Sequence, residues 1–281
     1  QARTFASTIQ RDIDQHFGQL TSIRRLYDAS GTMRRKDFRV FVMDDITQNG
    51  GTIRLEWLPK VNHEERAAFV ANARNNGLAD FKIQVISNEG KLQLAPTQKN
   101  HFPILFSEPG AANSTRIGLD PITTEIRNQI NARLGVSINK PITISSTDTK
   151  ANPLIIDSYL PIFSEKLSPN TFSSSLVGLI RGMFNLEKLI QRSAARLPGR
   201  ALGIQLYLYR FVEGNPQLLY ARGDSPGAAK PKPIKYDLLT GVYYSKRIRL
   251  PDQELELILT PENIKHFSQN VHILPWLITA V

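Results

Sequence analysis

Cysteine is absent from this sequence of 281 residues, and no long apolar run occurs within it. Without cysteine there can be no disulfide framework and no thiol nucleophile. A membrane-spanning helix needs about 20 apolar residues, so no segment inside the chain is predicted to cross a bilayer. The P-loop and the G-x-G-x-x-G fingerprint are also missing, and no nucleotide cofactor is predicted.

Histidine is scarce, with five residues, and none has the spacing of metal ligands. The stretch His63-Glu64-Glu65-Arg66 begins like a zinc-binding helix, but Ala67 stands where such a helix needs its second histidine. Neither a metal site nor a cofactor is therefore predicted. An acid–base enzyme built on Glu64 or Glu65 stays open as an alternative, although the helix dipole by itself favours carboxylates at a helix start.

Acidic residues are outnumbered, with 25 Asp and Glu against 35 Lys and Arg and a net charge of +10. Such a charge fits a nucleic-acid partner, a surface near anionic lipid, or a solvated basic surface. The basic residues are scattered, and aromatic residues do not alternate with them as in single-strand binders. No nucleic-acid partner is predicted.

Helical periodicity is strongest at the start of the chain. Apolar residues recur every three or four positions through residues 2–29, which predicts one long helix that forms a stalk. A second helix is predicted at 32–45, with Phe38, Phe41 and Val42 facing inward. Further helices are predicted at 63–76, 121–134 and 184–195, and the helix at 121–134 begins after Asp120 as its N-cap.

Alternating patterns and turn residues predict strands between these helices, at 53–57, 81–85, 92–94, 101–106, 142–144, 154–163, 176–183, 201–211, 216–220, 242–250 and 255–259. The first of them alternates Leu55 and Trp57 with Arg54 and Glu56, which predicts a half-buried strand. The strands come in antiparallel-looking pairs with helices inserted. This order indicates an α+β fold.

Both ends of the sequence look cut. The chain begins at Gln1 and ends with the apolar run HILPWLITAV. We expect an excised piece of a longer protein, in which residues 266–281 form a helix leading into a truncated transmembrane segment. A terminal strand or helix packed on the core is the alternative for this run.

Several short blocks follow one another in a distinctive order: Asp37-Phe38, LEWLPKV, Glu65-Arg66, Phe69, HFPILFSEP, GLD, Arg127, Pro161 and GLIRGMF. In this order and spacing the sequence resembles CHASE domains over about residues 30–220. These are extracytoplasmic ligand-sensing domains of membrane-bound histidine kinases, nucleotide cyclases and diguanylate cyclase or phosphodiesterase receptors. Structural roles are expected for the landmark residues Trp57, Glu65, Arg66, Asp120 and Arg127, with Trp57 in the core, Asp120 as a cap and Arg127 in an ion pair.

The resemblance implies an architecture. A long N-terminal stalk helix would precede two PAS-like antiparallel-sheet modules, and two transmembrane helices would frame the whole. On this sequence the stalk helices fall at 1–48, the membrane-distal ligand module at 49–165, the membrane-proximal module at 166–265 and the closing helix at 266–281. The resemblance also implies a homodimer through the stalk helices, a membrane anchor, and a location on the periplasmic or other extracytoplasmic face of the cell membrane.

The resemblance also implies where a small ligand would bind. In the plant cytokinin receptors an Asp on the distal-module helix bonds the adenine ring, and Ile126 occupies that position here. Small residues of the pocket strand correspond to Arg181 and Met183, and a pocket threonine to Thr143 or Asn139. The candidate ligand-binding residues are Ile126, Thr143, Ser145, Tyr159, Arg181 and Met183.

These departures argue against an adenine-type ligand. An Arg181 that faces the pocket would favour a carboxylate or phosphate, because its planar fork of donors suits both groups. The alternative is that Arg181 faces solvent on the sheet.

We therefore expect a ligand-sensing domain that has no activity of its own and signals through its first and last helices, with a cytoplasmic kinase or cyclase/phosphodiesterase output domain elsewhere in the receptor. A soluble hydrolase-type enzyme with residues 63–69 at its active site is the alternative. A receptor domain for a protein partner, with no small ligand, is the third hypothesis.

Overall fold

The computed structural model describes residues 2–48, 50–110, 116–134, 141–145, 154–164, 176–196, 204–222 and 243–261. The chain packs as two compact units, each of which is described by itself. The larger unit contains Gln15–Ser146 and Ile155–Asn185, and the smaller unit contains Gln1–Asp14, Thr147–Leu154 and Leu186–Val281.

Helix α1 (Ala2–Ser30) confirms the predicted long N-terminal helix. Its apolar stripe is buried along the whole length, at Phe5, Ile9, Ile13, Phe17, Leu20 and Ile23. The helix ends where Gly31 adopts a φ of 66°, a left-handed conformation that a side chain would strain. Residues up to Asp14 belong to the smaller unit and those from Gln15 to the larger one.

The larger unit is built on a five-stranded antiparallel sheet in the order β6-β1-β9-β8-β7. The strands are β1 (Thr52–Pro59), β6 (Phe106–Glu108), β7 (Ile142–Ser145), β8 (Ile155–Phe163) and β9 (Leu176–Asn185). Numbered by their occurrence along the chain, the five strands lie in the order 2-1-5-4-3. The last strand therefore lies beside the first, as in a PAS-like module.

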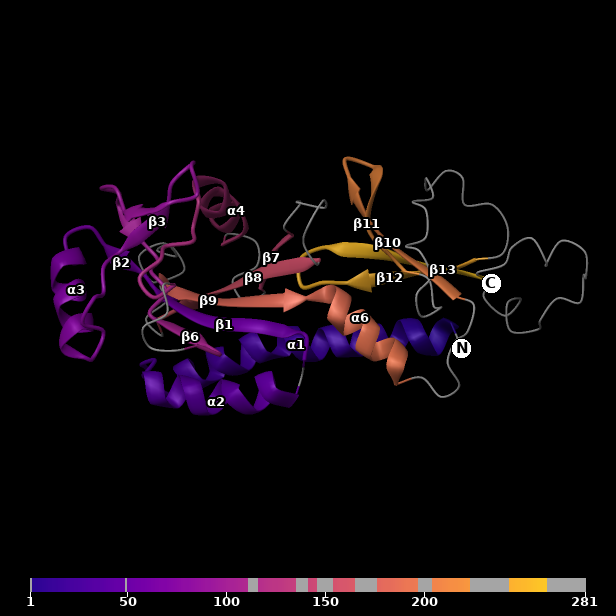
Figure 1. The fold of residues 1–281 in the computed structure, drawn as a ribbon, viewed down its shortest axis with the longest axis horizontal. Coiled ribbons are helices and arrows are strands. Elements are labelled where there is room, and N and C mark those ends of the chain that lie inside the picture. The colour runs from indigo at the N-terminus through magenta and orange to yellow at the C-terminus, as the bar shows by residue number, and fades with distance from the viewer. Residues whose placement is uncertain are drawn as a thin grey trace, which may run out of the picture. The chain divides into compact units, whose positions relative to one another are not determined.

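Helices cover both faces of this sheet (Figure 1). Helix α1 and helix α2 (Arg35–Gln48) lie along one face, where Tyr27 packs on Trp57 with ring centroids 5.9 Å apart. Helix α4 (Thr124–Leu134) lies on the other side. There it contributes to an apolar cluster formed by Leu58, Phe102, Ile104, Leu119, Ile122, Ile130, Ile142, Tyr159, Phe163 and Leu179.

A small lobe extends from the larger sheet. It consists of β2 (Val61–Asn62), α3 (Arg66–Asn75), β3 (Gln84–Ile86), β4 (Leu92–Leu94) and β5 (Asn100–His101). Its own core is formed by Val61, Ala73, Leu78, Phe81, Ile83 and Ala95.

The smaller unit contains a four-stranded antiparallel sheet in the order β11-β10-β13-β12. Its elements are α6 (Leu186–Ala195), β10 (Ile204–Val212), β11 (Asn215–Arg222), β12 (Tyr244–Arg249) and β13 (Glu254–Pro261). Helix α6 is tied to the start of α1, because Ser193 donates a hydrogen bond of 2.7 Å to the carboxylate of Asp12. Here too the last strand neighbours the first, and the predicted α+β class with two PAS-like sheets behind a long helix is confirmed.

Some local predictions were wrong. The helix predicted at 63–76 begins at Arg66, and the segment predicted as one strand at 101–106 holds only the ends of β5 and β6. Phe41 is exposed rather than inward. Glu56 is fully buried, so β1 is covered on both faces rather than half-buried.

The domain boundaries stay a prediction. A boundary at 165/166 would place residues 176–185 in the second module, whereas β9 pairs with β1 and β8 in the larger sheet. The helix predicted at 266–281 lies outside the described residues. Within the described ranges, no helix is both long and apolar enough to cross a membrane.

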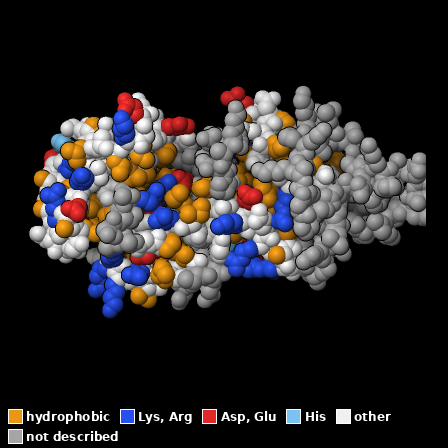
Figure 2. All heavy atoms as spheres, viewed as in Figure 1, with side chains coloured by type: hydrophobic (Ala, Val, Ile, Leu, Met, Phe, Trp, Pro, Cys, Tyr) orange, Lys and Arg blue, Asp and Glu red, His pale blue; other side chains and the backbone are white. Residues whose placement is uncertain are grey.

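Basic side chains are not gathered in one place on the face of the molecule shown in Figure 2. Lys and Arg side chains appear there at several separate positions, between hydrophobic and uncharged residues. This agrees with the scattered positions of these residues in the sequence.

The close packing of β1 against β9 gives a first test. A Cβ atom added at Gly178 would lie 2.6 Å from the carbonyl oxygen of Leu58 and 2.6 Å from the indole of Trp57. We expect Gly178→Ala to lower the free energy of unfolding by about 1–3 kcal/mol, measured by urea denaturation.

The matched control is Gly18→Ala in α1, where a Cβ would meet no atom within 4 Å. Since alanine is the better helix former, we expect this variant to gain about 0.5–1 kcal/mol. A neutral Gly178→Ala would contradict the close approach of the two central strands.

Candidate functional site

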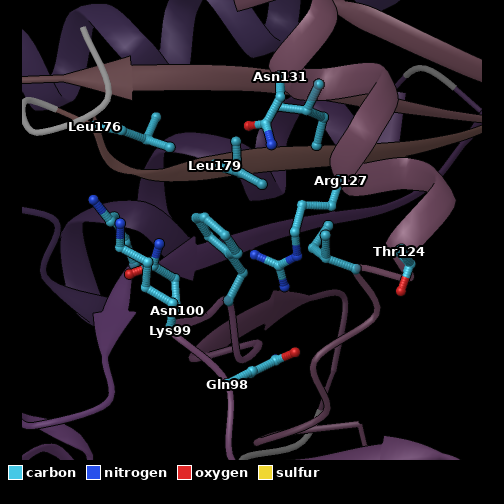
Figure 3. Close-up of a pocket in the computed structure, with 12 residues that line it drawn as sticks. Gln98, Lys99, Asn100, Thr124, Arg127, Asn131, Leu176 and Leu179 are labelled. Carbon is cyan, nitrogen blue, oxygen red and sulfur yellow. The ribbon is translucent and has the colours of Figure 1, made fainter. Parts of the chain in front are cut away.

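A cavity of about 450 Å³ lies in the larger unit, on the α4 side of its sheet (Figure 3). Its walls come from the segment 98–102, helix α4 with Ile122 just before it, the start of β9, and Lys60 after β1. The lining residues are Lys60, Gln98, Lys99, Asn100, Phe102, Ile122, Thr124, Arg127, Ile130, Asn131, Leu176 and Leu179.

The carboxylate of Asp120 holds two of these walls together. It accepts hydrogen bonds from the backbone N–H of Phe102 (3.1 Å) and of Ile122 (3.0 Å), and a longer one from the Gln98 amide (3.3 Å). The predicted capping role is therefore wrong, because α4 begins at Thr124. Thr123 caps this helix instead, with its hydroxyl accepting from the N–H of Ile126 at 3.2 Å.

Arg127 projects from α4 into the cavity (Figure 3). Its guanidinium carbon lies 5.4 Å from the centre of the Phe102 ring. Its Nη2 atom is buried and has no hydrogen-bond partner among the described residues. The sequence predicts an ion pair for Arg127, but the structure shows a cationic fork with an unused donor facing a cavity, which suits a carboxylate or phosphate group.

Arg181 is not in this cavity. It is buried in the middle of the sheet, where Nη1 donates to Glu56 at 3.0 Å and Nη2 donates to Asp157. Arg116 donates to the other oxygen of Glu56 at 3.1 Å. Both expectations for Arg181, a ligand contact and a solvent-exposed side chain, are therefore replaced by a buried ion-pair network formed by Glu56, Arg116, Asp157 and Arg181.

Tyr159 belongs to the same network. The guanidinium carbon of Arg181 lies 5.6 Å from the centre of its ring. Burial would lower the pKa of Arg181, but the nearby Tyr159, Asp157 and Glu56 outweigh it and raise the pKa above its ordinary value. Arg181 therefore stays protonated, and its positive charge is balanced by the carboxylates of Glu56 and Asp157 inside the sheet.

Of the other candidate ligand residues, Met183 lies beside this network, and the remaining three are dispersed. Met183 accepts a hydrogen bond from Arg116 at 3.9 Å. Ile126 packs against the apolar cluster beneath the cavity. Thr143 pairs with Ser158, and Ser145 pairs with Ile156, whereas Tyr159 pairs with Arg181. Ser158 and Ile156 therefore stand at positions of β8 that alternate with Tyr159.

The structure thus brings Tyr159, Arg181 and Met183 together, but beside the cavity, and Asn139 lies outside the described residues. The sequence analysis missed the polar residues that line the cavity. One signal was available: Thr124, Arg127 and Asn131 recur at helical spacing on a single face of α4.

The segment 63–69 does not form a catalytic centre in the described part of the larger unit. His63, Glu64 and Glu65 are exposed in the turn before α3, where Glu65 accepts a hydrogen bond from Asn62 at 2.9 Å. Among the described residues no group of three or more His, Cys, Asp or Glu could hold a metal ion. A G-x-S-x-G pattern does occur at residues 223–227, but it lies outside the described residues.

The chain thus combines a long N-terminal helix, two antiparallel PAS-like modules and a cavity in which the Nη2 of Arg127 has no hydrogen-bond partner among the described residues. The model of the CHASE domain matches residues 31–220. The chain belongs to the CHASE domain family, and it is a non-catalytic sensory domain on the extracytoplasmic side of the membrane. No curated protein matches the sequence.

Several solved sensory domains are similar to this chain at low identity. An extracellular ligand-binding receptor from Desulfohalobium retbaense is 11% identical with a TM-score of 0.48, and the match covers 91% of this chain but only 39% of the receptor. The periplasmic sensory domain of the Campylobacter jejuni chemoreceptor Tlp1 is 10% identical with a TM-score of 0.48, covering 95% and 94%.

The amino-acid chemoreceptor PctC of Pseudomonas aeruginosa, solved with GABA, gives 12% identity and a TM-score of 0.41, covering 91% of this chain and 94% of that domain.

The buried phenol of Tyr159 makes a prediction about pH. Burial, with Asp157 and Glu56 nearby, raises the pKa of Tyr159 in the folded protein, although Arg181 and Arg116 oppose the shift. The unfolded chain releases this proton at about pH 10, whereas the folded protein holds it to a higher pH. The contribution of the Tyr159 proton to the free energy of unfolding is therefore complete below about pH 10, and it is lost as the pH rises toward the folded-state pKa.

We therefore expect the wild type to lose stability relative to Tyr159→Phe between pH 7 and pH 10.5, measured by urea denaturation. At pH 7 the variant should equal or exceed the wild type by about 1 kcal/mol, because the hydroxyl is buried without a partner among the described residues. An equal stability difference at both pH values would contradict a buried, protonated phenol.

Proposed function

We propose that this domain senses a small molecule for a transmembrane signalling receptor and binds that molecule in the cavity between α4, residues 98–102 and β9. The observation that carries the proposal is the buried Nη2 of Arg127 at the cavity wall, which has no hydrogen-bond partner in the part of the chain that the structure describes. An unused charged donor in a recess is costly unless a ligand or water completes it.

The cavity has the size and chemistry of a ligand site. Its volume of about 450 Å³ falls within the range of about 300–1,000 Å³ usual for small-molecule pockets. Phe102, Leu179 and Ile130 supply apolar walls, and the amides of Gln98 and Asn131 supply polar contacts. Apolar walls with a few convergent polar groups both exclude water and fix the orientation of a ligand.

Strand β9 offers a route from the cavity to the stalk helix. Leu179 lines the cavity, while Gly182 approaches so close to α1 that an added Cβ would lie 2.9 Å from Leu20. A ligand that stabilises one position of β9 would bias the position of α1 in the same unit. The proposed signal is a small displacement of α1, passed through flanking membrane helices to a cytoplasmic kinase or cyclase/phosphodiesterase domain.

A homodimer through the stalk helices is part of the proposal. The apolar stripe of α1 is buried against its own chain, so a contact between two copies would use the other face of the helix, which exposes Arg11 and Asp14. Such a contact would be polar and sensitive to salt.

A ligand screen by thermal shift tests the proposal. We expect at least one small molecule to raise the melting temperature of the wild type. Arg127→Met should weaken its binding by about 10- to 100-fold, because hydrogen bonds to charged groups contribute about 1.5–3 kcal/mol.

Arg34→Met is the matched control, since Arg34 is exposed on the surface of the same unit. It should bind the molecule like the wild type. If no compound stabilises the protein, or if Arg34→Met and Arg127→Met behave alike, the cavity is not the sensory site.

A further inference from the structure

We propose that the ligand of this cavity is a small dicarboxylate, bound by Arg127 at one end and by Lys99 at the other. The inference rests on the proposed function and names the chemistry of its ligand.

The charge of the cavity wall has one sign. Lys60, Lys99 and Arg127 line it, and no Asp or Glu occurs among the described lining residues. The carboxylate of Asp120 is close by, but both of its oxygens accept hydrogen bonds from the chain itself. Arg127 and Lys99, with no Asp or Glu among the described lining residues, attract an anion with more than one negative charge.

The cationic groups lie apart. Figure 3 shows the guanidinium of Arg127 entering from α4, and Lys99 with Asn100 on the opposite side of the cavity. The Nη2 of Arg127 is buried, whereas Lys99 is exposed. One anionic group would therefore bind Arg127 inside the cavity, and a second would bind Lys99 near its mouth.

The cavity also has apolar lining. Phe102, Ile122, Ile130, Leu176 and Leu179 supply it, beside the polar side chains Gln98, Asn100, Thr124 and Asn131. The apolar side chains suit a short carbon chain, which needs no hydrogen bonds of its own. Two separated anionic ends on a carbon chain describe a dicarboxylate, whereas a phosphate ester carries its two charges on one group.

An amino acid or an amine fits this wall poorly. An ammonium group needs a carboxylate or an open aromatic face. The described lining offers no carboxylate, and the guanidinium of Arg127 already lies over the Phe102 ring. A second cation placed there would be repelled by the three basic residues.

Calorimetric titration with compounds of one chain length tests this inference. Succinate carries two carboxylates, butyrate one, and 4-aminobutyrate one carboxylate with an ammonium group. Glutarate and adipate test the spacing, and inorganic phosphate tests the alternative anion. We expect the best dicarboxylate to bind at least about tenfold more tightly than butyrate, and 4-aminobutyrate to bind most weakly.

Two variants test which residue binds each carboxylate of the ligand. Lys99→Gln should weaken dicarboxylate binding about fivefold and change butyrate binding less than about twofold, since an exposed charge pair contributes about 1 kcal/mol or less. Arg127→Met should weaken both. Lys91→Gln is the control for a general charge effect, because Lys91 is exposed on the small lobe outside the cavity, and it should leave binding unchanged.

The outcomes separate this inference from the proposed function. Butyrate or 4-aminobutyrate that binds as tightly as every dicarboxylate, or phosphate that binds more tightly than all of them, would overturn the dicarboxylate assignment. An uncharged or cationic compound that depends on Arg127 would overturn it too, with the sensory cavity intact. If no compound of any class stabilises the protein, the proposed function itself fails.

Discussion

The larger sheet depends on one buried charge. Glu56 is fully inaccessible in the central strand β1, and it is tolerated there because Arg181 and Arg116 each donate to one of its oxygens. Removing one partner of a buried pair costs about 3–5 kcal/mol, because the remaining charge stays out of water. These donors reach Glu56 from β9 and from the chain before β7, so the ion pairs join segments far apart in the sequence.

The ion-pair network and the cavity each contain an arginine, and the two arginines differ in their partners. Arg181 and Arg127 are both arginines on the α4 side of the sheet, but the fork of Arg181 is used by carboxylates of its own chain, whereas Arg127 keeps a buried donor without a partner among the described residues. The first arrangement stabilises a strand pairing, and the second leaves binding energy for a ligand. The family resemblance pointed to Arg181, which does not line the cavity, since it compared positions along a strand and not the partners that surround them.

Periodicity predicted much of the fold. The apolar stripe of α1 gave its extent to within one residue, and the strands of both sheets other than β6 lie close to their predicted segments, because local hydrophobic spacing decides them. The burial of Glu56 and the capping of α4 by Thr123 were not predictable in this way, since both depend on tertiary neighbours. The cavity was missed for the same reason: it forms only where residues 98–102 meet α4, through the carboxylate of Asp120.

The glycines of β9 have a consequence for strand pairing. Gly178 and Gly182 let the strand pass close to Trp57 and Leu20, but strands with glycine are prone to slide along their neighbours. A slip by one residue would turn Arg181 toward α1 and set Ile180 against Glu56. The carboxylate of Glu56 would then be buried without its Arg181 partner. The charged residues thus oppose this misalignment, because a buried carboxylate that loses its arginine partner destabilises the sheet.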